Sequence, residues 1–197
     1  MIVRLLEEEI ASCTRCGLHK TRTRAVPGEG NPEAEMVFIG EAPGFFEDQE
    51  GRPFVGQAGK LLDELLARVG LSRSKVYILN IVKCRPPQNR DPLPEEINAC
   101  SPWLTSQLSL LHPRLIITLG RYSLNHFFPS ESISKVHGKP RRLENVIYYP
   151  MYHPAAALHQ ARMRQIIEED FKVLPSVLKS GGKVAENPDQ PQQLSLF

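Results

Sequence analysis

The sequence predicts an α/β fold, a three-layer α/β/α arrangement around a central four-stranded, mostly parallel sheet. Short apolar runs alternate along the chain with longer segments whose apolar residues recur at helical spacing. Runs of this length, closed by glycine or a polar residue, are typical of strands buried on both faces. Strands that alternate with helices form parallel sheets covered by helices. The predicted strands cover residues 36–39, 76–82, 115–119 and 146–149.

The helices between these strands are predicted from apolar spacing and from the residues at their ends. In the first, apolar residues recur every three or four positions until Gly70 ends the pattern. The second begins at Pro94, because proline is tolerated in a first helical turn, and Pro113 lies beyond its end. The predicted helices cover residues 60–69, 94–111, a short stretch from 121 to about 128, and 155–178.

Composition and charge place the chain among ordinary globular proteins. It has 197 residues, is 41% hydrophobic and carries a net charge of +2. No apolar run is long enough to span a bilayer, and Arg4 is followed by acidic residues instead of a signal stretch. We therefore expect a cytoplasmic monomer that does not associate with membranes. Two basic clusters favour a polyanionic partner; they are Arg15, Lys20, Arg22 and Arg24, and Lys135, His137, Lys139, Arg141 and Arg142.

The chain contains four cysteines, Cys13, Cys16, Cys84 and Cys100. The first two form a C-x-x-C pair that can bind one metal centre, and the fold must bring the other two to it. Disulfides are not expected, because nothing marks the chain as secreted. A redox pair would need its C-x-x-C at a strand-to-helix turn, whereas Cys13 and Cys16 precede every predicted strand. Spacing alone favours a [4Fe–4S] cluster and leaves zinc, which more often uses two short C-x-x-C pairs, as the alternative.

Polar residues follow three of the predicted strands. Gly40-Glu41-Ala42-Pro43-Gly44 follows the first, Asn80 ends the second, and His153 follows the fourth. Ligands of such sheets bind outside the carboxyl ends of the strands, so these groups should converge. Each is weak evidence alone, since a single histidine is more often structural than catalytic. Phe54, a core aromatic by default, could stack on a ligand because its loop is flanked by glycines.

Four longer stretches carry a family resemblance. GEAPG, GRPFVGQAGKLLDELL, YILNIVKCRPPQNRDP and HPAAAL, together with the four cysteines, closely resemble the family 4 uracil-DNA glycosylases over roughly residues 10–175. The resemblance implies a glycosylase domain over residues 1–178 with a structural [4Fe–4S] cluster, which decides against zinc. It also implies a monofunctional enzyme of base excision repair that excises uracil from DNA. The alternatives are a glycosylase for a broader set of deaminated bases and a catalytically inactive iron–sulfur module that binds DNA.

The resemblance also implies how the base is held. Phe54 would stack on the flipped uracil ring. The Asn80 amide would bond the O4 and N3–H edge, which cytosine presents with donor and acceptor exchanged. His153 would donate to O2, where negative charge develops as uracil leaves.

Further positions receive roles from the same resemblance. Glu41 would lie by the attacking water or the pocket backbone, and Glu47 would crowd the methyl group of thymine. Gly40 and Ala42 would line the uracil pocket. Leu158 matches the side chain that wedges into the vacated duplex space.

The chain departs from the family pattern at several of these positions. Phe45 and Phe46 stand where acidic residues are frequent, which would make the pocket entrance more apolar. Ala42 stands where another glycosylase family has its water-activating aspartate, so the group that orients the water stays open. His159 stands where a basic residue is frequent.

Residues 179–197 differ in composition from the rest. Ser180-Gly181-Gly182-Lys183 breaks the final helix, and the polar, proline-containing stretch 186–193 predicts a disordered tether. The last five residues resemble the short motif with which bacterial DNA-processing proteins bind the replication sliding clamp. We therefore predict that Gln193, Leu194, Leu196 and Phe197 bind a sliding clamp.

Overall fold

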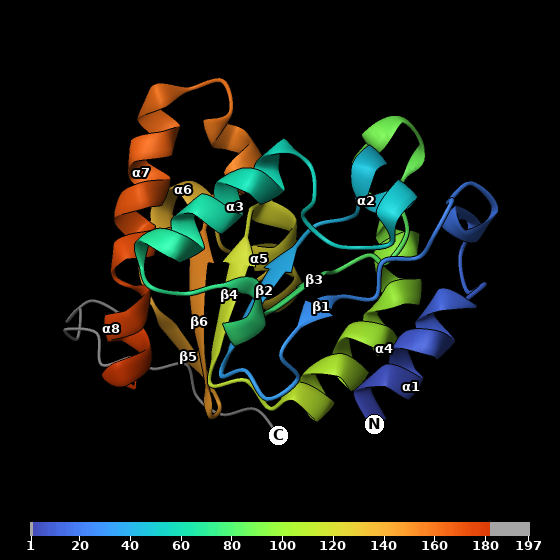
Figure 1. The fold of residues 1–197 in the computed structure, drawn as a ribbon, viewed down its shortest axis with the longest axis horizontal. Coiled ribbons are helices and arrows are strands. Elements are labelled where there is room, and N and C mark those ends of the chain that lie inside the picture. The colour runs from blue at the N-terminus through green and yellow to red at the C-terminus, as the bar shows by residue number, and fades with distance from the viewer. Residues whose placement is uncertain (1, 182–197) are drawn as a thin grey trace.

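The computed structural model describes residues 2–181, whose strands form one six-stranded sheet in the order β1-β3-β2-β4-β6-β5 (Figure 1). The four central strands are parallel to one another. They confirm the predicted α/β fold and lie close to the predicted positions. Their bounds are Met36–Gly40 (β2), Tyr77–Asn80 (β3), Leu115–Leu119 (β4) and Val146–Met151 (β6).

Two short antiparallel strands extend the sheet at its edges. β1 (Glu29–Gly30) pairs with β3, and β5 (Arg141–Leu143) pairs with β6. Neither has an apolar run, so apolar patterning did not predict them. Gly30 lies so close to β3 that a Cβ there would be 2.1 Å from the carbonyl oxygen of Val76. Only glycine allows this approach.

Helices cover both faces of the sheet, because successive strand residues point to opposite sides. On β2, Met36 and Phe38 face one core, whereas Val37 and Ile39 face the other. The first core is completed by α3 (Gln57–Arg68), α7 (Ala161–Lys172) and α8 (Leu174–Lys179). The second is completed by α1 (Ile2–Ala11), α4 (Pro94–Leu111) and α5 (Arg121–Phe127).

Most of the predicted helices are confirmed, but the last is not continuous. α3, α4 and α5 agree with the predictions, whereas α1 and the short α2 (Phe45–Glu50) were not predicted. The predicted helix 155–178 is divided into a 3-10 turn, η4 (Pro154–Ala157), and then α7 and α8. Pro175 lies in the first turn of α8, where its ring and missing N–H prevent continuation from α7. The remaining short elements are η1 (Gly17–Lys20), η2 (Arg73–Lys75), η3 (Pro87–Asn89) and α6 (Ile133–Val136).

None of the helices within residues 2–181 has the length and apolar character needed to cross a membrane.

Candidate active site and cysteine cavity

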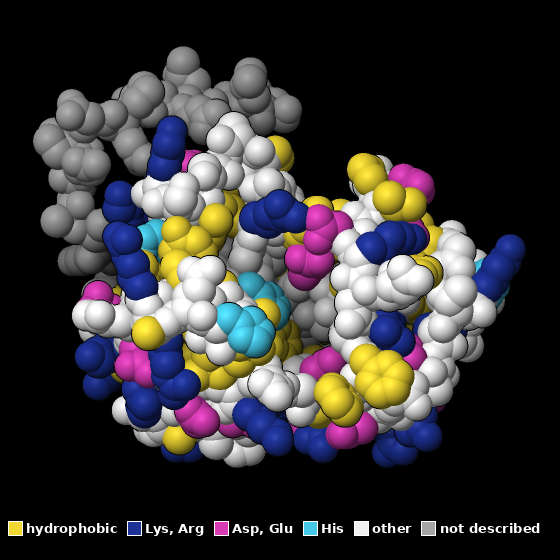
Figure 2. Space-filling model, turned by 90° about the horizontal axis from the view of Figure 1, so that it is seen from above, with side chains coloured by type: hydrophobic (Ala, Val, Ile, Leu, Met, Phe, Trp, Pro, Cys, Tyr) yellow, Lys and Arg dark blue, Asp and Glu magenta, His cyan; other side chains and the backbone are white. Residues whose placement is uncertain are grey.

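A cavity of about 420 Å³ opens at the carboxyl ends of β2, β3 and β6. Figure 2 looks onto this face and shows it hollowed between two raised parts. The cavity brings together residues that the sequence predicted from separate strand ends. It is lined by Glu41, Ala42, Pro43, Gly44, Glu47, Phe54, Ala58, Asn80, Pro86, Asn89, Arg90, His153 and Ala155.

Asn80 supplies a buried amide at the inner wall. It is the last residue of β3, and its side-chain Oδ1 is buried without a hydrogen-bond partner among residues 2–181. Gly40 makes room for it, since a Cβ at Gly40 would lie 2.3 Å from this Oδ1 and 2.7 Å from Cζ of Phe54. An orphaned buried acceptor is costly, and a ligand N–H would satisfy it.

Phe54 is held in an unusual backbone conformation beside this amide. Its φ is +53°, in the left-handed region that non-glycine residues rarely adopt. Arg73 donates hydrogen bonds to the carbonyl oxygens of Pro53 and Phe54 on one side. Glu47 Oε1 accepts hydrogen bonds from the N–H groups of Val55 and Gly56, each at 2.9 Å, on the other. The ring is therefore fixed at the pocket wall.

His153 stacks on Phe54, with ring centroids 5.4 Å apart and an interplanar angle of 25°. Its Nδ1 accepts a hydrogen bond from the N–H of Ala155 at 3.1 Å. A neutral imidazole with an accepting Nδ1 carries its proton on Nε2. Burial lowers the pKa of His153 to about 4, against the opposing charge of Glu47, so the ring is neutral at physiological pH. It is therefore a neutral hydrogen-bond donor.

Glu41, directly after β2, is poised to titrate. Burial, together with the smaller effect of the nearby Asp91 carboxylate and against the opposing charge of Arg121, raises the pKa of Glu41 to about 7. Arg121 is itself ion-paired with Asp91 at 2.5 Å. A carboxylate with such a pKa can accept a proton near neutrality. Sequence reasoning did not find Asp91 or Arg121, although Asp91 lies within the stretch YILNIVKCRPPQNRDP.

Glu47 ties the pocket loops together. Besides its bonds to the loop after Phe54, its Oε2 accepts a hydrogen bond from the N–H of Gly44 at 3.1 Å. This bracing role was not predicted from the sequence, and exclusion of thymine by Glu47 stays a prediction. Leu158 follows η4, is 37% exposed and is not one of the residues that line the cavity. Its role as a wedge in the DNA duplex also stays a prediction.

A further part of the cavity wall comes from η3 and the residues around it. Pro86, Asn89 and Arg90 line the cavity, and sequence reasoning did not select them as pocket residues. Arg90 forms a bidentate ion pair with Glu96, at 2.9 and 2.6 Å, which anchors this wall to α4. Gln88 and Asn89 both have φ of +55°, so this wall follows no regular pattern that periodicity could reveal.

The four cysteines line a second cavity, on the side of the sheet covered by α1 and α4. Cys13 and Cys16 follow α1, Cys84 follows β3, and Cys100 lies on α4. The fold therefore brings the distant pair to the C-x-x-C pair, as the sequence requires of a shared site. The cavity is completed by Ile10, Arg15, His19, Arg22, Val82, Lys83, Ala99 and Trp103.

Several N–H groups donate to the cysteine sulfurs. Arg22 Nη1 lies 3.0 Å from Sγ of Cys84, and Trp103 Nε1 lies 3.1 Å from Sγ of Cys13. The backbone N–H of Lys83 lies 3.3 Å from Sγ of Cys100. Such donors suit sulfur that carries negative charge, as ligated thiolates do.

The buried cysteines lack the character of reactive thiols. Burial raises the pKa of Cys84 and raises that of Cys100 to about 11, whereas reactive thiols have lowered pKa values.

Within residues 2–181, no three His, Cys, Asp or Glu side chains lie close enough to hold a single metal ion.

Comparison with known proteins identifies the family. A model described as the uracil DNA glycosylase superfamily matches residues 27–173. The type-4 uracil-DNA glycosylase of Sulfurisphaera tokodaii is 51% identical over 177 residues, which cover 85% of this chain and 80% of the relative. That of Archaeoglobus fulgidus is 50% identical over 173 residues, 83% and 87% of the two chains. That of Thermotoga maritima is 43% identical over 186 residues, 92% and 97%. The chain therefore belongs to the uracil-DNA glycosylase superfamily and, within it, to the type-4 enzymes.

Proposed function

We propose that this chain is a monofunctional uracil-DNA glycosylase that hydrolyses the bond between uracil and deoxyribose and so initiates base excision repair. Its family is one of hydrolases that act on N-glycosyl bonds. The observation that carries the proposal is the buried, unpartnered Oδ1 of Asn80 at a pocket that also contains Phe54 and a neutral His153.

Asn80 and Phe54 would select the base. The unpartnered Oδ1 accepts from N3–H of uracil, and the amide nitrogen donates to O4. Cytosine has an acceptor at N3 and a donor at C4, so the same amide faces like groups and binds it poorly. Sites built on paired polar groups discriminate strongly, because the wrong base leaves them unsatisfied. Phe54, fixed from both sides, stacks on the flipped ring.

His153 would stabilise the leaving group. As the C1′–N1 bond breaks, its electron pair passes to uracil and charge spreads onto O2. The Nε2–H of a neutral imidazole donates a hydrogen bond to this oxygen without surrendering its proton. Because Ala155 fixes the tautomer, the donor is in place before the reaction begins.

Water would complete the hydrolysis. Its oxygen forms the new bond to C1′, and the proton that it loses passes to a base. Glu41 is the carboxylate of the pocket whose raised pKa suits this task. Ala42 cannot serve, since its side chain has no titratable group.

A structural [4Fe–4S] cluster held by Cys13, Cys16, Cys84 and Cys100 is part of this proposal. The donor set fits, because four cysteines line one cavity and N–H groups point at three of their sulfurs. Thiolates that bind separate corners of a cluster lie farther apart than those that bind one zinc ion. When bound, the cluster would tie the segment after α1 to β3 and α4, and it would take no part in the hydrolysis.

The partners proposed are uracil-containing DNA and, through Gln193, Leu194, Leu196 and Phe197, a bacterial sliding clamp. These four residues lie outside the described part of the chain, as does most of the predicted tether. The proposal for the clamp rests on the sequence motif alone.

Excision assays on oligonucleotides with uracil, hypoxanthine or a thymine mispair test the function. We expect rapid release of uracil, and no release from the intact-base control. Asn80→Ala should lower the rate by about 10²- to 10³-fold, the usual cost of one preorganised group. Asn80→Asp should begin to release cytosine, because its carboxylate accepts from the cytosine amino group.

The matched control is Asn98→Ala, which makes the same chemical change at an exposed position of α4. It should behave as the parent. Unchanged uracil excision by Asn80→Ala would show that the base is read elsewhere. Release of hypoxanthine as fast as uracil would assign the chain a broader specificity.

A further inference from the structure

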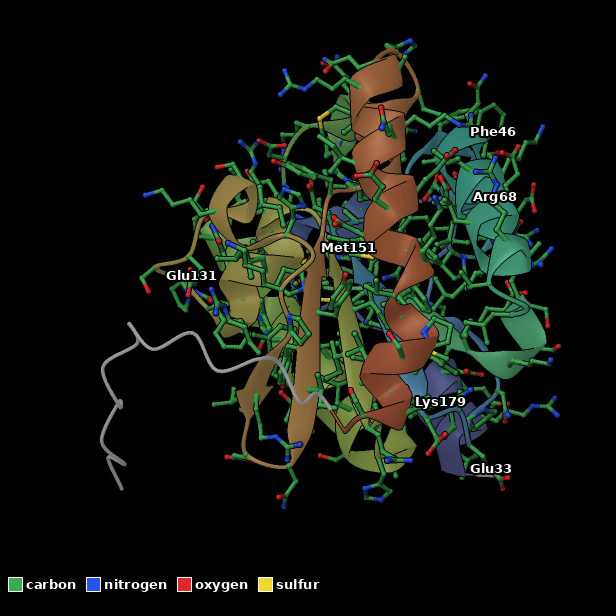
Figure 3. All side chains as sticks on the ribbon, turned by 90° about the vertical axis from the view of Figure 1, so that its left-hand side faces the viewer. Glu33, Phe46, Arg68, Glu131, Met151 and Lys179 are labelled. Carbon is green, nitrogen blue, oxygen red and sulfur yellow. The ribbon has the colours of Figure 1, made fainter. Side chains whose placement is uncertain are left out.

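Two phenylalanines are exposed beside the pocket. Phe45 and Phe46 begin α2, directly after the pocket residue Gly44, and are 48% and 57% exposed. By contrast, Phe38 and Phe171 are at most 1% exposed. The two rings meet edge to face, with centroids 5.5 Å apart. In Figure 3, Phe46 and Lys179 lie at opposite ends of the molecule. The parallel strands run toward the end where Phe46 lies. The rings therefore stand at the pocket end.

The helix that carries these rings is firmly anchored, so their exposure is a fixed feature. Glu47 binds Gly44 and the loop after Phe54. The next residue, Asp48, is buried and accepts a hydrogen bond from the N–H of Thr23 at 2.8 Å. Two consecutive carboxylates thus hold α2 from within, while two consecutive aromatic rings face solvent.

Arg85 completes this surface. Its guanidinium carbon lies 5.1 Å from the centroid of the Phe45 ring, and its Nε donates to Oδ1 of Asn89 at 2.6 Å. Nearby Arg90 and Arg121 are each bound to a carboxylate, whereas Arg85 is bound to a neutral amide. Its positive charge is therefore available at the edge of the pocket. Figure 2 shows exposed hydrophobic groups together with Lys or Arg on the raised part at the right.

We propose that a surface formed by Phe45, Phe46 and Arg85, here named the aromatic rim, binds an unpaired nucleobase. This nucleobase is the neighbour of the flipped uracil on the same DNA strand. This inference rests on the proposed function. The rim is continuous with the pocket, because Gly44 and Pro86, the chain neighbours of Phe45 and Arg85, line the cavity. A base stacks on the phenylalanine rings, and Arg85 neutralises the adjoining phosphate.

The chemistry of the rim points to single-stranded DNA. Every base has a π face, so stacking on an aromatic side chain tolerates any sequence. In a duplex, however, neighbouring base pairs cover these faces. The aromatic rim should therefore increase the affinity for single-stranded DNA more than the affinity for a duplex.

Binding of fluorescent oligonucleotides by the full chain tests the inference without requiring catalysis. The probes are a single strand with one uracil, the same strand with thymine instead, and the duplex of each. We expect Phe45→Leu with Phe46→Leu to weaken binding of both single strands by about tenfold, because leucine keeps the apolar surface but not the π face. The duplexes should lose much less. Phe45→Tyr with Phe46→Tyr should retain single-strand binding.

Leu143→Ala is the matched control, since it alters an exposed apolar residue on β5, and it should bind like the parent. Parental single-strand binding by the double leucine variant would overturn the inference, as would equal losses on single strands and duplexes. A parent that binds DNA but never releases uracil would refute the proposed function and leave the rim intact, because the thymine strand reports on the rim alone.

Discussion

The pKa values of two pocket residues, His153 and Glu41, shift in opposite directions for one physical reason. Burial disfavours whichever form is charged, so it lowers the pKa of His153 and raises that of Glu41. His153 is therefore neutral at all pH values well above 4, whereas Glu41 titrates near neutrality. Asp91 adds to the shift of Glu41 because a second negative charge disfavours its ionisation. The pocket therefore combines a histidine that stays neutral around pH 7 with a carboxyl group that titrates there.

The rate of excision should follow the ionisation of Glu41. If Glu41 is the base, the rate rises with pH through about 7 and then levels off, since only the carboxylate accepts a proton. His153, with its pKa near 4, adds no inflection in this range. Asp91→Asn removes a repulsive charge and the partner of Arg121, and both changes lower the pKa of Glu41. The rise should then move to lower pH in profiles of kcat from about pH 5 to 9.

Glu33→Gln, a charge change in an exposed turn, is the control for this profile and should leave the midpoint in place. If the midpoint of the pH profile were the same in Asp91→Asn as in the parent, Glu41 would be excluded as the base.

Predictability at the residue scale depended on how each side chain reaches the pocket. Glu41, Asn80 and His153 lie at strand ends, and the rule that parallel strands end at one edge was enough to group them. Their individual roles came from the family resemblance. Asn89 and Asp91 arrive on an irregular connection with positive φ angles, which no periodicity encodes. The bracing role of Glu47 depends on backbone N–H groups from two loops and is invisible in the sequence.

At the scale of elements, burial decided what the sequence could predict. The four central strands are buried on both faces and show up as continuous apolar runs. The edge strands β1 and β5 have few apolar residues, because an edge has less to bury. The predicted helix 155–178 is interrupted between η4 and α7, and again before Pro175, where its apolar spacing continues but the helical backbone cannot. Pattern thus identified which face is buried but not where a helix is interrupted.

The elements around the cysteines yield a prediction about retention of the proposed [4Fe–4S] cluster. The guanidinium carbon of Arg15 lies 4.2 Å from the Trp103 ring centroid, and Trp103→Phe keeps an aromatic ring there but removes the indole N–H that donates to Cys13. Removing a hydrogen bond to a metal ligand typically lowers metal affinity by about 10- to 100-fold. We therefore expect the variant to lose iron to a chelator on the order of tenfold faster than the parent. Visible absorbance and iron content measure this loss. Melting followed by circular dichroism checks that the fold survives, and iron retention equal to that of the parent would deny the contact any role.

At the scale of the whole molecule, one strand joins the two sites. β3 ends at Asn80, and Cys84 follows four residues later. Between them, Lys83 is 1% exposed; its Nζ donates to the carbonyl oxygen of Asn80 at 2.6 Å and its backbone N–H to Cys100. The position of Asn80 therefore depends on the packing around the cysteines. A structural cluster in this place would support the pocket without entering the chemistry.

The end of the chain gives the prediction that reaches beyond the enzyme itself. Gln193 to Phe197 lies outside the described residues and resembles a clamp-binding motif, in which apolar side chains supply most of the affinity. Leu196→Ala with Phe197→Ala should abolish binding to a bacterial sliding clamp, and Ser195→Ala, which spares the apolar residues, should not. Surface plasmon resonance with immobilised clamp measures the affinity, and excision of a short oligonucleotide verifies that each variant is folded. A short peptide that must be ordered on binding has modest affinity, so the parent should bind in the micromolar range. Absence of parental binding at tens of micromolar, or equal binding by the double alanine variant, would remove the clamp from the partners of this chain.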